Sequence, residues 1–298
     1  MLVYCLGAML PVASSGGVTI FCPDDGRYSF FNSPYLSHQI MTGVDIYSDV
    51  SINNTAQSPV CGKILHVRRV KAPPGRDFKA PDHDTVTIIG TNMPDRVVKI
   101  LHVETEIPVG EYVGVGAILG PMIRSGYFGY RTPLHAHVEV RPVTDPLRVR
   151  GGYLMESLLE LDKLEPTTEL AGTVAYARRG YAQIRLKGDA KWVVTDVGGR
   201  PGILDGGIPL YGWLGTHVNA PNVGAAITLC GKKIGFVTYT RPRSCVAECT
   251  AFDSRISSTQ VDLFFVLSPQ RSTIFMATSK RRDELDLNVD DEVEVTIS

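Results

Sequence analysis

Apolar residues recur along the first half of the chain in short runs, separated by Gly, Pro, Asn and Asp. The runs between residues 18 and 147 are rich in β-branched and aromatic residues, as in VTIFC, DTVTIIG, RVVKILHVE and LHAHVEV. Runs of this length and composition are typical of strands, and the residues between them are typical of turns. The pattern therefore predicts an all-β domain.

The opening segment, MLVYCLGAMLPVASSGGVTIFC, is apolar but is interrupted by Pro11 and by the pair Gly16 and Gly17. It lacks a basic n-region, and its uninterrupted apolar stretch is too short to span a membrane. We interpret it as two strands joined by the SSGG turn, with a poor signal peptide as the alternative. We accordingly expect a cytoplasmic protein with no membrane partner, and secretion stays open as the alternative.

Residues 151–166, GGYLMESLLELDKLEP, have the spacing of leucines and acidic residues that is typical of a helix. This spacing predicts a helix that ends at Pro166 and closes a first domain over residues 1–165. After residue 170 a second series of strand-like runs begins, including GTVAYARR, AKWVVTDV and VDLFFVLS. We expect a second all-β domain over residues 170–298, and the sequence gives no indication of its role.

The composition narrows the class of partner. With 30 Lys and Arg residues against 31 Asp and Glu residues, the net charge of −1 provides no broad basic surface for a phosphate backbone. Nucleic acid is therefore not an expected partner. The six cysteines are scattered without a C-x-x-C pair, which favours buried thiols in a reducing compartment. The oligomeric state stays open.

The stretch TPLHAHVEVR contains two of the seven histidines, His135 and His137. Residues two apart on a strand face the same side, so both imidazoles can reach one metal ion, or one can bind metal while the other transfers protons. A half-exposed strand also carries polar residues at this spacing, so the pair alone leaves both interpretations open. Glu139 follows on the same side, where it either orients an imidazole or is a solvated carboxylate.

The segments GVDIYSD, SPVCGKI, KILHV, IPVGEYVGVGAILG and PLHAHVEVR resemble, in this order, the motifs of the lysostaphin-type zinc metallopeptidases. The resemblance covers about residues 35–150. It implies a duplicated hybrid motif fold, which is barrel-sandwich-like, and a bound Zn²⁺ that activates water to attack a peptide or other amide. The usual substrates of this family are glycine-rich or cross-bridge peptides of bacterial cell walls.

The resemblance also implies roles for individual residues. Carried over by position, Asp45 and His137 are metal ligands. His102 and His135 are then the pair that polarises the substrate and stabilises the oxyanion, which suits imidazoles beside a metal-bound water. In the loop GYFGYR just before the H-x-H pair, Tyr127 and Tyr130 either line a substrate groove or pack over the end of the domain.

One position departs from the family pattern. The family has its first zinc histidine four residues before the aspartate, and here that position is Met41, whose thioether is a poor zinc ligand. Either His38 supplies the missing ligand, or the site is incomplete and the protein is a catalytically inactive binding or scaffold module. Because His38 and Asp45 would lie on opposite faces of an unbroken strand, convergence requires a bulge or loop at the sequence MTG.

The first hypothesis is therefore a zinc-dependent peptidase in which His38, Asp45 and His137 bind the metal. The second is the inactive module. His66 and His83 have no motif support, and we interpret them as ordinary surface or strand residues.

Overall fold

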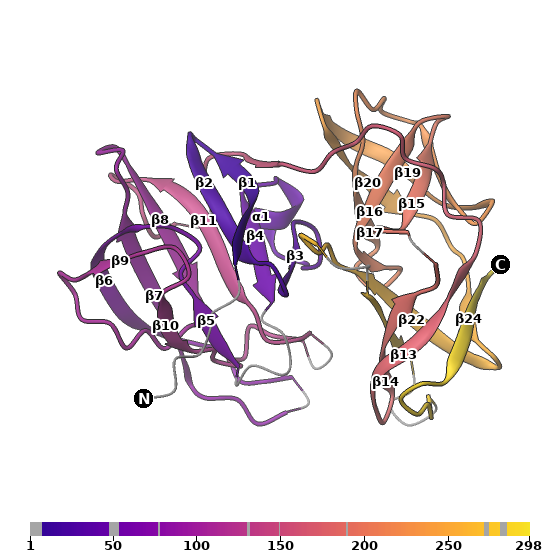
Figure 1. The fold of residues 1–298 in the computed structure, drawn as a ribbon, viewed down its shortest axis with the longest axis horizontal. Helices are drawn as coiled ribbons and strands as arrows, with labels where there is room; N and C mark the ends of the chain where they lie inside the picture. The colour runs from indigo at the N-terminus through magenta and orange to yellow at the C-terminus, as the bar shows by residue number, and fades with distance from the viewer. Residues whose placement is uncertain are drawn as a thin grey trace. The chain divides into compact units, whose positions relative to one another are not determined.

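The computed structural model shows a protein built almost entirely of strands, in two compact units (Figure 1). It describes residues 8–47, 54–76, 78–129, 132–148, 150–188, 190–270, 274–280 and 285–298. The first unit comprises Met1–Tyr28 and Leu36–Leu158, and the second comprises Ser29–Tyr35 and Leu159–Ser298. The prediction of a mostly β protein is confirmed.

The first unit begins with an antiparallel hairpin of β1 (Met9–Ser15) and β2 (Val18–Pro23). The turn between them contains Gly16 and Gly17, whose φ angles of 52° and 80° lie in the region that glycine adopts without steric cost. The two strands and the SSGG turn predicted from the sequence are thus confirmed.

Residues 151–166 are not helical, so the predicted closing helix is wrong. They contain the short strand β12 (Met155–Ser157), which pairs antiparallel with β1. Leu159 and Leu161 are buried, whereas Leu158 between β12 and Leu159 is 46% exposed. Burial that alternates every second residue is the period of an extended chain, and pairing with a strand far away in sequence has overridden the local helical preference.

The main sheet of the first unit has the order β3-β4-β11-β8-β7-β6-β9, in which β4, β11 and β8 lie side by side (Figure 1). Its strands are β3 (Arg27–Ser29), β4 (Gly43–Tyr47), β11 (Ala136–Pro142), β8 (Arg96–Leu101), β7 (His83–Gly90), β6 (Gly62–Lys71) and β9 (Tyr112–Val113). A separate pair is formed by β5 (Thr55–Gln57) and β10 (Ile118–Pro121).

Strand β11 is buried on both faces along most of its length. One face contributes Val138 and Val140 to the apolar core, while the other carries His137, Glu139 and Arg141. Because polar groups are costly to bury without partners, this second face must be satisfied by neighbouring side chains. It is the face on which the candidate site is built.

The second unit contains one large sheet of order β15-β18-β19-β20-β17-β16-β22-β21-β24-β13-β14-β23. Additional pairings of β15 with β16 and of β22 with β23 close this sheet on itself twice, around an apolar core that includes Val174, Ile184, Leu263 and Phe275. The bounds are β13 (Leu170–Arg178), β14 (Tyr181–Leu186), β15 (Val194–Val197), β16 (Pro201–Ile208), β17 (Trp213–His217), β18 (Ala226–Leu229), β19 (Lys232–Arg241), β20 (Ser244–Cys249), β21 (Ser254–Ile256), β22 (Thr259–Phe265), β23 (Ile274–Ser279) and β24 (Glu292–Ile297).

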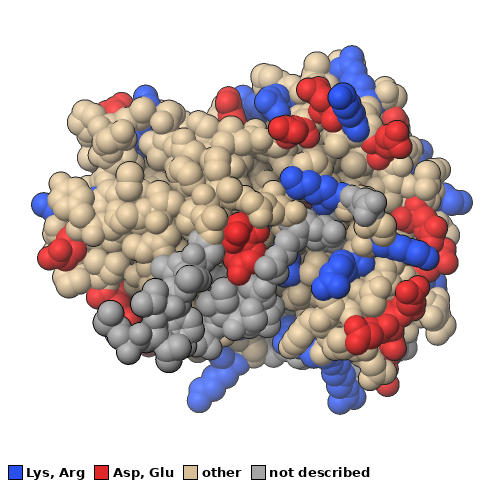
Figure 2. Space-filling view, viewed as in Figure 1, with Lys and Arg blue, Asp and Glu red and all other residues tan. Residues whose placement is uncertain are grey.

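Charged side chains are distributed unevenly over one face of the molecule. On the face shown in Figure 2, acidic and basic side chains gather together over the second unit, while most of the surface over the first unit is uncharged. Among the residues that the structure describes, no helix has the length and apolar character needed to cross a membrane.

Candidate metal centre

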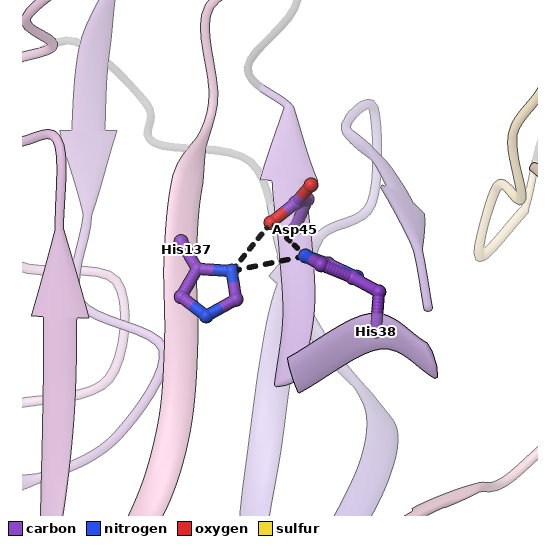
Figure 3. Close-up of side chains that lie close together, drawn as sticks. All are labelled: His38, Asp45 and His137. Carbon is purple, nitrogen blue, oxygen red and sulfur yellow. Dashed lines mark hydrogen bonds and ion pairs between the residues drawn. The ribbon is translucent and has the colours of Figure 1, made fainter. Parts of the chain in front are cut away.

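Asp45 and His137 are brought together by strand register. Strand β11 pairs antiparallel with β4, and His137 lies directly opposite Asp45. Side chains at opposite positions of adjacent antiparallel strands have their Cβ atoms about 5 Å apart. Here Nδ1 of His137 lies 2.8 Å from Oδ1 of Asp45, and both residues are buried (Figure 3).

His38 reaches the same point from helix α1 (Leu36–Gln39), the single turn just before β4. After this turn Met41 adopts a left-handed backbone with φ of 59°, and the amide of Thr42 donates to the carbonyl of Ser37 at 2.7 Å. The chain therefore reverses direction, and His38 Nε2 lies 3.3 Å from Asp45 Oδ1 (Figure 3). This reversal is the break in the strand that convergence of His38 and Asp45 requires.

The three donor atoms have the chemistry and spacing that Zn²⁺ prefers. His38, Asp45 and His137 each offer one ligand atom, all within 4.8 Å of one another. Ligands at the usual zinc distances in a tetrahedral site lie about 3.3 Å apart. The separation between His38 Nε2 and His137 Nδ1 is 3.2 Å, and those to Asp45 Oδ1 are 3.3 and 2.8 Å. Two imidazoles and a carboxylate are a common zinc ligand set, so these residues fit the ion.

The charges of Asp45 and His137 also suit a cation site. Burial raises the pKa of Asp45, but the neighbouring His135 and His38 and a hydrogen bond from His137 outweigh it and hold that pKa well below its usual value. Burial lowers the pKa of His137, but hydrogen bonds to Asp45 and Glu139 outweigh it and raise the pKa to about 9. Without metal, His137 is thus a cation between two carboxylates, and metal binding would release its proton.

Glu139 is buried rather than solvated, so the solvated alternative is wrong. Its Oε1 accepts a hydrogen bond from His137 Nε2 at 3.0 Å and lies 3.3 Å from Lys99 Nζ, while Arg141 Nη1 donates to Oε2 at 3.2 Å. Burial raises the pKa of Glu139, but these partners outweigh it and lower the pKa to about 2. A carboxylate bound to one ring nitrogen of His137 fixes the other nitrogen towards Asp45, as carboxylates beside metal-binding histidines do.

His135 lies on the other side of Asp45, just before β11. Its Nδ1 donates to the carbonyl of Pro133 at 2.9 Å, because a carbonyl oxygen can only accept. Burial lowers the pKa of His135 to about 4, although the charge of Asp45 acts in the opposite direction. The neutral ring therefore presents a lone pair on Nε2, 3.4 Å from Asp45 Oδ2, and that oxygen is buried without a hydrogen-bond partner among the described residues.

His102 is held by a carboxylate that the sequence did not reveal. His102 directly follows β8 and has a left-handed φ of 69°, and its Nδ1 lies 2.5 Å from Oδ2 of Asp84. The same oxygen accepts a hydrogen bond from Ser125 Oγ at 2.6 Å. Burial raises the pKa of Asp84, but these hydrogen bonds lower it overall, so Asp84 is a carboxylate. The ring centroids of His102 and His135 are 5.4 Å apart.

Aromatic rings pack beside the two histidines. The ring centroid of Phe128 lies 4.8 Å from that of His102 and 4.6 Å from that of His135. Tyr127, which is 36% exposed, has its ring 6.4 Å from His102, whereas Tyr130 lies outside the described residues.

Two other histidines of the first unit have surface environments. His66 is exposed on β6. His83 is partly exposed and pairs with Asp82 and Glu104. Neither belongs to the group formed by His38, Asp45 and His137, in keeping with their interpretation as ordinary strand or surface residues.

The similarity of this chain to known proteins does not identify the site. Residues 20–157, a little under half of the chain, match the family described as "Domain of unknown function (DUF8155) N-terminal domain". No curated protein matches the chain. Among solved structures, the chain is similar to "The antimicrobial peptidase lysostaphin from Staphylococcus simulans", with 12% sequence identity over 92% of this chain and 96% of that chain. The TM-score of this similarity is 0.29.

Proposed function

We propose that the protein is a zinc-dependent hydrolase that cleaves an amide bond, with His38, Asp45 and His137 as the metal ligands. The observation that carries the proposal is the convergence of their three donor atoms in a buried site. Zn²⁺ bound there would lower the pKa of a bound water towards neutrality and polarise the carbonyl of the amide. The order of motifs that resembles the lysostaphin-type metallopeptidases adds to this support.

His102 is the proton-transfer group in this proposal. Asp84 holds the proton on Nδ1 and leaves Nε2 free to accept a proton from the attacking water. The Asp84 carboxylate then stabilises the imidazolium that forms, as an aspartate does behind a catalytic histidine. The protonated ring can donate to the oxyanion and return its proton to the leaving amine.

His135 positions the water. Its Nδ1 proton is held by the carbonyl of Pro133, and burial keeps the ring neutral. The lone pair on Nε2 can therefore accept a hydrogen bond from water beside Asp45. His135 is not a metal ligand in this proposal, unlike His38 and His137. Its substitution should therefore leave the ion bound.

The first test is metal analysis of protein purified without chelator. We expect about one zinc per chain, and His38→Ala should retain less than a tenth of an equivalent, because two remaining ligands hold the ion poorly. A rise in the thermal midpoint when zinc is added to the metal-free protein should accompany binding. Absence of both zinc and a thermal shift would disprove the proposal.

The second test measures hydrolysis. A fluorogenic pentaglycine peptide and a mixed peptide library analysed by mass spectrometry serve as probes. His135→Ala should keep the zinc and lower kcat by about 10²–10⁴-fold. Stoichiometric zinc without cleavage of any probe by the wild type would favour the alternative, a catalytically inactive binding or scaffold module.

A further inference from the structure

One row of side chains crosses five adjacent strands of the main sheet on the face that carries Asp45 and His137. His137 of β11 lies opposite Asp45 of β4 on one side and opposite Leu101 of β8 on the other. Leu101 lies opposite Val86 of β7, and Val86 lies opposite Arg68 of β6. Side chains at directly opposite positions of antiparallel strands share a face, so these five residues form one row, which we call the central row.

The middle of the central row is apolar and incompletely covered. Val86 is buried, and the side chains of Leu65, Val70 and Leu101 pack against it and are themselves only partly buried. Their accessible surface lies beside His137, because Leu101 is the neighbour of His137 on the adjacent strand. An apolar surface that borders a reactive centre can bind an apolar side chain of a substrate.

The far end of the central row is an exposed cation. Among the residues that the structure describes, no carboxylate pairs with Arg68. Arg69, the next residue, points to the opposite face of β6 and pairs with Glu104. Two strand spacings, about 10 Å, separate Leu101 from Arg68. An anionic group at this distance from Leu101 would therefore meet an available guanidinium.

The other directions away from the metal centre are filled by described residues. Along β11, Arg141 is completely buried, and its Nη2 donates to the carbonyl of Arg150 at 2.7 Å. In the opposite direction the rings of His135 and Phe128 pack together, with centroids 4.6 Å apart. On the β4 side, the turn of α1 presents His38. The direction that these groups leave for a bound chain is the one along the central row.

We propose that the central row binds the substrate of the hydrolase and selects peptides with an apolar side chain and a carboxylate about three residues apart. The inference rests on the proposed function, which places the amide to be cleaved at His137. The apolar side chain packs on Leu101, and the carboxylate accepts hydrogen bonds from the guanidinium of Arg68. An extended chain rises about 3.4 Å per residue, so three residues span the distance between these groups. A chain of glycine alone offers neither group and is a poor substrate.

Peptide binding to the metal-free protein tests the row apart from catalysis. The probe is rhodamine-labelled Ala-Leu-Ala-Ala-Glu-Ala, and fluorescence anisotropy measures its affinity. The reversed sequence, Ala-Glu-Ala-Ala-Leu-Ala, is a second probe, because the row sets the spacing and not the direction of the chain. In one of the two directions, Gln in place of Glu in the peptide should weaken binding about 3–10-fold. Gly in place of Leu should weaken it by a similar factor.

Two variants of the protein assign these preferences to the row. Arg68→Gln should abolish the preference for Glu over Gln, and Leu101→Ala should reduce the preference for Leu over Gly. Arg69→Gln, the adjacent residue on the opposite face, is the matched control and should retain both preferences. If Leu101→Ala fails to fold, the exposed Arg68 variant still decides the question. Equal affinity for the Glu and Gln peptides in both directions, or a preference that survives Arg68→Gln, would overturn the inference.

Hydrolysis by the zinc-loaded protein separates this inference from the proposed function. Cleavage of one of the two probes with at least tenfold higher kcat/KM than pentaglycine would support both. Cleavage of pentaglycine in preference to both probes would overturn the inference and leave the hydrolase supported. Selective peptide binding by a protein that binds no zinc would support the central row as a peptide site and disprove the hydrolase.

Discussion

Asp45 and Asp205 are both completely buried aspartates with imidazoles beside them, one in each unit, yet their surroundings differ. Asp205 accepts hydrogen bonds from the hydroxyl of Ser29 and the amide of Phe30, and one imidazole, that of His217, lies beside it. Its charge is thus compensated by fixed donors of the protein. Buried charges with such partners act as structural anchors.

Asp45 instead faces three imidazoles, those of His38, His135 and His137. One of its oxygens has no hydrogen-bond partner among the described residues, and neutral His135 directs a lone pair towards that oxygen. The other oxygen accepts from His137, whose proton a bound metal ion would displace, so the site can exchange a proton for a metal cation. The comparison shows that burial of an aspartate beside histidine does not by itself indicate a metal site. What distinguishes the two sites is whether hydrogen-bond donors satisfy both oxygens of the carboxylate, as at Asp205, or only one of them, as at Asp45.

The largest expected effect is the loss of zinc from Asp45→Ala. Asp45 is the carboxylate that contacts both His38 and His137. Its removal should weaken zinc binding by about a thousandfold or more, because metal affinity depends on the number and charge of the ligands. Chelator competition measures this change. Zinc affinity within tenfold of the wild type would show that Asp45 does not bind the ion. Asp45 and Asp205 would then both be structural carboxylates.

The corresponding substitution in the second unit, Asp205→Asn, should lower the free energy of unfolding. It removes the charge that Ser29, Phe30 and His217 surround, and breaking a buried network of this kind costs about 2–4 kcal/mol. Urea unfolding of the metal-free protein measures the free energy. Asp253→Asn, which alters a partly exposed carboxylate bonded to Arg255 and Gln260, is the matched control and should cost much less. Equal effects of the two substitutions would contradict the anchoring role of Asp205.

A smaller effect is expected from Glu139→Gln. The amide no longer holds the charge that orients His137, so zinc affinity should fall by about 10–100-fold while the ion still binds. Isothermal titration with zinc measures the difference. Glu104→Gln, at a partly exposed carboxylate paired with Arg69, should not change the affinity. A loss as large as that from Asp45→Ala would mean that Glu139 is itself a ligand.

The smallest expected effect is that of His66→Ala. This histidine is exposed on β6 and belongs to neither site. Zinc stoichiometry and the free energy of unfolding should both equal those of the wild type within error. A reduced stoichiometry would show that the ligand set extends beyond the buried cluster.

Local features were predicted well from the sequence. The β1 and β2 hairpin follows from two short apolar runs and a glycine pair, because a tight turn and its flanking strands are specified by neighbouring residues. The predicted helix over 151–166 failed for the converse reason. Its leucine spacing favours a helix locally. The backbone of β12 instead forms its hydrogen bonds with β1, which lies near the start of the chain.

Some features of the candidate site follow from neighbouring residues in the sequence, and others depend on the tertiary structure. The sequence by itself determined that His135 and His137 lie two apart beside a strand, and that Met41 occupies a position where the resembling family has histidine. Only the tertiary structure decided that His38 converges with Asp45, because that depends on the left-handed backbone of Met41. The support of His102 by Asp84 depends on the register of β7 against β8, and the hydrogen bond from Ser29 to Asp205 joins residues that are far apart in the chain. Strand periodicity is a property of neighbouring residues, whereas strand register and chain reversal depend on the packing of the whole unit.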